Sequence, residues 1–133
     1  MDILSNHEDM KISINNKIIK IDRQCYEIVK YFNNIGLKTR YCCNGHYEQG
    51  LYVIFDDNIT DKNIEDFIEE TEGVGGGNFF KWTRMLDDKI SSNWTYQFYL
   101  TYNITELVLN TVRYFKVYKP EENDYVKIIT IDK

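Results

Sequence analysis

The chain has 133 residues, 43% of them hydrophobic, and its 21 acidic residues outnumber 16 basic ones to give a net charge of −5. This length and apolar content predict one folded domain with its own core. Proteins that follow a nucleic-acid polymer carry a basic stripe, so the acidic balance and dispersed basic residues argue against a polymeric nucleic acid as partner. No apolar stretch approaches the ~20 residues of a membrane-spanning helix, so we expect no membrane partner.

The N-terminal segment is polar and acidic and lacks the basic start and apolar stretch of a secretory signal. We expect one domain over residues 1–133, folded from about residue 10, with residues 1–9 as the candidate for disorder. The three cysteines are odd in number and follow no framework spacing, which predicts free thiols. These features favour a cytoplasmic protein.

The first half of the chain predicts a hairpin, a helix and two further strands. In residues 10–22 apolar and polar side chains alternate on both sides of an Asn-Asn pair, which is typical of a β-hairpin. Residues 23–35 repeat apolar side chains at helical spacing, and Gly36 is a natural stop. Residues 37–43 and 51–57 read as strands joined by a polar turn.

A second helix is predicted from a cap at Thr60 or Asp61, with a solvated acidic face in the stretch EDFIEETE. Four glycines then fall within residues 73–77. A phosphate-binding loop needs a helix after it, whereas a strand follows here, so the glycines predict a flexible linker or lid.

The second half continues with two aromatic strands, at residues 79–86 and 94–102. Asn103 and Glu106 form a capping-box pattern before a third helix, which ends at Pro120. A last strand closes the chain. The order ββ-α-ββ-α-ββ-α-β predicts an α+β fold in which three helices pack on a mainly antiparallel sheet.

Cys42, Cys43 and His46 lie close together in the stretch LKTRYCCNGH. Adjacent strand residues face opposite ways and no second pair of ligands follows at a zinc spacing, so we expect no metal there. A Cys–His nucleophile would need an orienting third group that the sequence does not supply. We therefore expect a turn at residues 44–45, with one cysteine toward the core and His46 at a rim within reach of an anion.

The aromatic strands carry the most informative pattern. Phe80, Trp82 and Arg84 share one face of the first strand. In the second, one face runs from Trp94 to Tyr102 and reads as core, and the other carries Thr95, Gln97, Tyr99 and Thr101 as a polar platform. Aromatic rings beside cations suit a purine with a phosphate. Ordinary cross-strand packing with solvated charges is the alternative.

This pattern defines a set of candidate ligand-binding residues. We expect the anion to be neutralised by Arg113, Arg84 or Lys81. We expect adenine to stack on Trp82, Phe80 or Tyr99, and a ribose or base edge to bond Asn93 or Gln97. His46 completes the set. No catalytic group and no cofactor is expected.

The stretches YFNNIGLKT, YCCNGH and YVIFDD resemble a segment of small phage proteins. The shared pattern comprises Gly36, Lys38, Thr39, Cys43, Gly45 and His46. On these residues the chain resembles the Thoeris anti-defence family of phage proteins, the first type described. That resemblance implies a non-catalytic sponge in the bacterial host cytoplasm. Such a sponge sequesters cyclic ADP-ribose isomers and assembles as a homodimer or higher homo-oligomer.

The leading hypothesis is therefore a non-catalytic protein that sequesters a cyclic nucleotide-type immune signal and inhibits host antiphage defence. One alternative is an anti-CRISPR-like inhibitor that binds a protein partner through its acidic surface. The other is a small enzyme that uses Cys43 and His46.

Overall fold

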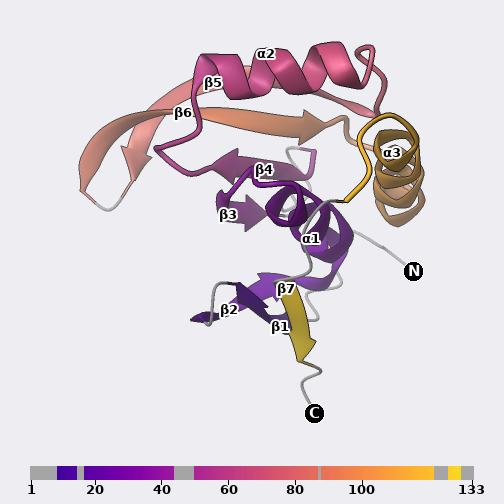
Figure 1. The fold of residues 1–133 in the computed structure, drawn as a ribbon. Helices are drawn as coiled ribbons and strands as arrows, with labels where there is room; N and C mark the ends of the chain where they lie inside the picture. Colours follow the sequence, from indigo (N-terminus) through magenta and orange to yellow (C-terminus); the bar gives the residue numbers. More distant parts are fainter. Residues whose placement is uncertain (1–8, 15–16, 44–49, 87, 122–125, 130–133) are drawn as a thin grey trace.

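The computed structural model describes residues 9–14, 17–43, 50–86, 88–121 and 126–129 (Figure 1). The elements follow in this order: β1 (Asp9–Ile14), β2 (Lys17–Asp22), the short 3-10 turn η2 (Arg23–Cys25), α1 (Tyr26–Asn34), β3 (Thr39–Cys43), β4 (Tyr52–Phe55), α2 (Asp61–Glu70), β5 (Gly77–Leu86), β6 (Lys89–Phe98), α3 (Ile104–Tyr118) and β7 (Val126–Ile129). The α+β class and the element order confirm the prediction.

The strands form two sheets rather than the one sheet predicted. One has the order β2-β1-β7 and the other the order β3-β4-β6-β5, and every pairing is antiparallel. Helix α1 lies between the two sheets (Figure 1). The split arises because β1 pairs with β7 instead of joining the four-stranded sheet, and hydrophobic alternation carries no information about which strands pair.

All three helices pack on one face of the four-stranded sheet through an aromatic core. Phe32 of α1 lies with its ring centroid 4.9 Å from that of Phe55 in β4. Phe67 of α2 lies 4.9 Å from Phe115 of α3, edge to face. Edge-to-face rings at such spacings add about 0.5–1.5 kcal/mol per pair beyond their buried area. This aromatic layer therefore fixes how the helices sit on the sheet.

The helix ends follow the signals in the sequence. The α1 helix stops at Gly36, whose φ of +91° suits glycine. The N–H of Leu37 donates to Phe32 O at 2.8 Å and that of Gly36 to Asn33 O at 3.1 Å, which is a Schellman motif. The α2 helix begins with a capping box between Thr60 and Asn63.

The glycine run is packed and does not form the flexible linker or lid predicted from its composition. The N–H of Gly76 donates to the Thr111 hydroxyl at 2.9 Å and that of Gly77 to the Tyr96 hydroxyl at 2.9 Å. A Cβ at Gly76 would lie 2.5 Å from Leu107 Cδ1. The glycines are therefore needed because α3 and β6 approach the backbone closely.

The prediction of three free thiols is wrong for two of them. Cys25, fully buried at the end of η2, forms a disulfide with Cys42 of β3 across 17 residues. Cys42 thus faces the core, as expected for one of the two adjacent cysteines, and Cys43 is the unbridged one. The pairing depends on the packing of α1 against β3, which spacing along the sequence does not reveal.

The second aromatic strand ends earlier than predicted. β6 runs from Lys89 only to Phe98, so Leu100 and Tyr102, which alternation placed on the core face, are 52% and 95% exposed. Trp94 is half-buried and donates its indole N–H to Asp61 of α2 at 2.8 Å. Only Tyr96 and Phe98 of the predicted core face are fully buried.

Candidate ligand-binding face

The register of the four-stranded sheet separates its two faces. Tyr96 pairs with Phe79 on one side and with Val53 on the other, and all three lie on the helix-covered inner face. Because side chains alternate along a strand, the neighbouring residues form the opposite surface, here called the outer face. It carries Tyr41 and Cys43 of β3, Tyr52 and Ile54 of β4, Asn78, Phe80, Trp82 and Arg84 of β5, and Ser91, Asn93, Thr95 and Gln97 of β6.

Three aromatic rings and one guanidinium gather on the outer face. The Tyr52 ring lies 5.5 Å from that of Trp82, and the Phe80 ring lies 6.1 Å from it on the other side. Arg84 Cζ lies 4.2 Å from the Trp82 centroid and 5.9 Å from the Tyr52 centroid. These distances are in the range of a cation–π contact. We call Tyr52, Phe80, Trp82 and Arg84 the Trp82 cluster.

The Arg84 guanidinium is incompletely satisfied. Its Nη1 is buried and has no hydrogen-bond partner among the described residues. The guanidinium also interacts electrostatically with the phenol of Tyr52, which contacts Cys43. Burial, with Cys43 adding to it, raises the pKa of the Tyr52 phenol against the opposing effect of Arg84, so the phenol stays neutral at neutral pH. A buried guanidinium N–H without an acceptor is costly and calls for an oxygen from elsewhere.

A hollow of about 460 Å³ opens at the end of the outer face that is remote from Arg84. Asn78 of β5 and Gln97 of β6 face each other there in the sheet register. The hollow is lined by Gly50, Asn78, Phe80, Gln97, Phe98, Tyr99 and Leu100. Tyr99, a predicted site residue, is 60% exposed at its edge. Phe80, Gln97 and Tyr99 are thus brought together, and Phe80 joins the hollow to the Trp82 cluster.

Asn93 lies on the outer face but is occupied by structural bonds. It is only 3% exposed, and its amide donates to Phe55 O at 3.0 Å and to Asp57 Oδ1 at 2.7 Å. Its oxygen accepts a bond from the Ser91 hydroxyl. The Asn93 amide holds the pKa of the Asp57 carboxyl below its usual value, and Arg40 at 2.8 Å adds to this. Asn93 therefore holds the end of β4 to β6, and both of its amide hydrogens are used in these structural bonds.

Lys81, a predicted anion-binding residue, points away from the outer face. It pairs in register with Trp94 on the inner face and forms an ion pair of 2.7 Å with Asp61 at the start of α2. The Lys81 ammonium, and then the Trp94 indole, hold the pKa of the Asp61 carboxyl below its usual value. This ion pair fastens the middle of the β5–β6 hairpin to α2, which lies along it (Figure 1).

The remaining predicted residues lie elsewhere. Arg113 is exposed on α3, a helix of the inner face, and donates to Asn110 Oδ1 at 3.0 Å, so it does not reach the Trp82 cluster. His46 lies outside the described residues. Asn78 and Tyr52 are additions to the candidate set. The sequence alone could not identify Tyr52, because its place beside Gln97 depends on the pairing of β4 with β6. Asn78 could have been identified, because it lies two residues before Phe80 and so shares a face with Phe80 and Trp82.

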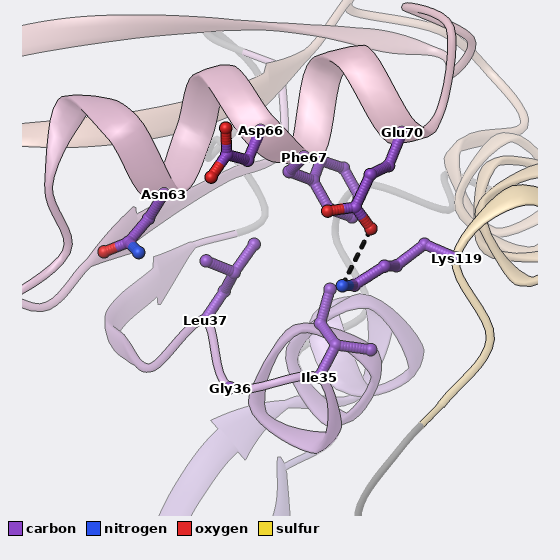
Figure 2. A pocket seen from close by; sticks show the side chains of 8 residues that line it. All are labelled: Ile35, Gly36, Leu37, Asn63, Asp66, Phe67, Glu70 and Lys119. Atoms are coloured by element: carbon purple, nitrogen blue, oxygen red, sulfur yellow. Dashed lines mark ion pairs between the residues drawn. The ribbon is translucent and has the colours of Figure 1, made fainter.

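A second, smaller cavity of about 180 Å³ lies between α2 and the turn that follows α1 (Figure 2). Ile35, Leu37 and Phe67 supply its apolar part. Its charged rim is paired, because Glu70 binds Lys119 at 2.8 Å and Asp66 binds Lys62 at 3.2 Å. This cavity offers neither an aromatic platform nor an unpaired cation to an anionic ligand.

Two further observations concern other kinds of site. Within the described ranges, no three His, Cys, Asp or Glu side chains converge as a metal site would require. No helix in the described part of the chain is long and apolar enough to cross a membrane.

Comparison with known proteins places the chain in a family. Residues 10–126 match the family model described as YoqC prophage protein. No curated protein and no solved structure matches the chain. The matched segment spans most of the chain and includes every element from β2 to α3. The chain therefore belongs to the YoqC prophage protein family.

Proposed function

We propose that this prophage protein binds a small nucleotide-type signal on the outer face and sequesters it without catalysis, so that a host antiphage defence is inhibited. The observation that carries the proposal is the Trp82 cluster, in which Nη1 of Arg84 has no hydrogen-bond partner within the part of the chain that the structure describes. A phosphate oxygen would supply the missing acceptor through a charge-assisted hydrogen bond, which is about twice as strong as a neutral one.

The positions of the candidate residues in the fold change which of them we expect to bind the anion and which to stack on the base. Arg84 is the anion-binding group, because Lys81 is held by Asp61 and Arg113 lies on α3. Phe80 and Tyr99 offer ring faces beside the hollow, whereas Arg84 already covers one face of Trp82. A ring that stacks on such an aromatic gains about 1–3 kcal/mol.

Family membership and resemblance support the same reading. A prophage protein acts in a bacterial host, where interception of a defence signal is a useful activity. The resemblance to the first Thoeris anti-defence type suggests a cyclic ADP-ribose isomer as the signal and a homodimer or higher oligomer as the assembly. A sponge needs a site that binds and releases an intact ligand, which aromatic rings and a guanidinium provide.

The test is to incubate the protein with extracts of cells in which immune TIR enzymes are active, denature it, and identify the released molecule by mass spectrometry. We expect an intact cyclic nucleotide, and an Arg84→Gln variant should release at least 10-fold less, since a hydrogen bond to a charged group contributes about 1.5–3 kcal/mol. Arg113→Gln is the matched control because it removes the same charge from α3. Release of no nucleotide, or equal release from Arg84→Gln, would contradict the proposal.

A protein-binding function is the second candidate, and one observation favours it. The acidic run on α2 leaves Glu65, Glu69 and Glu72 exposed, where they can meet a basic partner surface. Two other carboxylates of the run are already paired with lysines. If the triple variant to glutamine abolishes anti-defence activity while nucleotide release is unchanged, this second function replaces the first.

An enzymatic role for Cys43 remains the third hypothesis. Cys43 lies on the outer face beside Tyr52, and the proposed partner His46 lies outside the described residues. Recovery of a hydrolysed nucleotide in place of the intact one would favour that role.

A further inference from the structure

We infer that the hollow beside the Trp82 cluster reads the edge of an adenine base, with Asn78 and Gln97 as the reading pair. This inference rests on the proposed function and deepens it by assigning base and anion to separate parts of the outer face. The volume of about 460 Å³ falls within the roughly 300–1,000 Å³ typical of small-molecule sites.

The two carboxamides are placed as a pair. Asn78 and Gln97 occupy the same register position of adjacent antiparallel strands, so their Cβ atoms lie about 5 Å apart on one face. Neither side chain bonds another described residue, in contrast to the fully occupied amide of Asn93. Each carboxamide presents a donor beside an acceptor, which matches the N6 amino group and N7 of adenine.

Aromatic rings stand on either side of this pair. Phe80 lies two residues from Asn78 along β5, and Tyr99 lies two residues from Gln97 in the opposite direction along the sheet. Both rings line the hollow, Phe80 from within β5 and Tyr99 from the residue that follows β6. A planar base can stack on either ring while its edge meets the carboxamides.

The described residues that line the hollow are all neutral, which favours a base over a phosphate at this end. Gly50 contributes backbone only, and a Cβ there would collide with the carbonyl of Phe98, so the chain before β4 lies directly against β6.

Tyr52 connects the hollow to the anion-binding end of the outer face. Tyr52 is the register partner of Gln97 on β4, and its ring centroid lies 5.9 Å from Arg84 Cζ. One nucleotide can therefore place its base at Asn78 and Gln97 and its phosphate near Arg84, across the ring of Tyr52.

The experiment measures the affinities of adenosine, AMP and ribose 5-phosphate by isothermal titration calorimetry. Gln97→Glu and Asn78→Asp keep the side-chain shape but remove the amide donors. We expect each to weaken adenosine binding by about 5- to 150-fold, the range for one bidentate base contact of about 1–3 kcal/mol. Asn58→Asp makes the same change on an exposed turn after β4 and should leave adenosine binding unchanged. Melting temperatures verify that each variant folds.

The outcomes separate the inference from the proposed function. Unchanged adenosine affinity in both variants, or ribose 5-phosphate binding as tight as that of AMP, would overturn the base reading. The proposed function would survive that result if Arg84→Gln still weakens AMP. If none of the three probes binds the wild-type protein, both the inference and the proposed function fail for adenine nucleotides.

Discussion

Reduction of the Cys25–Cys42 disulfide should destabilise the protein substantially. The bridge spans 17 residues, and closing a loop of that length restricts the unfolded chain by about 3 kcal/mol at 25 °C. The half-cystine at position 25 is fully buried and ties η2, at the start of α1, to β3. The cost of reduction thus falls on the junction that positions α1 on the sheet.

Urea denaturation with and without a reductant measures this cost. For a urea slope of about 1–3 kcal/mol per molar, a loss of about 3 kcal/mol lowers the midpoint by roughly 1–3 M. Cys43→Ser is the matched control, because Cys43 is unbridged and the variant should show the same drop on reduction as the wild type. Thiol counting in denaturant should find one free thiol before reduction and three after. Three thiols before reduction, or superimposable curves, would refute the reasoning.

Two further predictions concern stability. Thr111→Val removes the buried acceptor of the Gly76 N–H and should cost about 1–3 kcal/mol in thermal denaturation, whereas Thr111→Ser keeps the hydroxyl and should cost clearly less; equal losses would contradict the hydrogen bond. Asp57 and Asp61 have lowered pKa values in the folded protein, so their stabilisation is complete above their unfolded pKa near 4 and is lost as the pH falls through the folded values. The urea concentration at the unfolding midpoint should therefore decrease when the pH is lowered below about 4. This decrease should be less steep in an Asp57→Asn variant, and an equally steep decrease would count against a role for the Asp57 carboxylate.

Local signals in the sequence were sufficient to predict the helices and to assign the side chains of β5 to its two faces. The cap at Thr60 and the stop at Gly36 act within a few residues, and the alternation of Phe80, Trp82 and Arg84 depends only on the extended backbone. These parts of the fold and of the candidate site could be predicted because their causes are local.

The structure adds most to the sequence where long-range contacts decide it. The glycine run is packed because α3 and Tyr96 lie against it, and Lys81, which strand alternation places on the inner face, forms an ion pair there with Asp61 of α2. The side-chain amide of Asn93 donates its hydrogen bonds to Phe55 O and Asp57 at the end of β4. Such partners are distant in sequence, so composition alone could not identify which polar groups remain available to a ligand.

The pairing of β1 with β7 affects how the chain folds during synthesis. Lys11 pairs with Ile129, a separation of 118 residues (129 − 11), so the three-stranded sheet closes only after β7 has left the ribosome. Until then the β1–β2 hairpin lacks its third strand, and a two-stranded hairpin is by itself marginally stable in water. Contacts of such separation slow folding, and translation that stops before β7 would yield a chain whose smaller sheet lacks an edge strand.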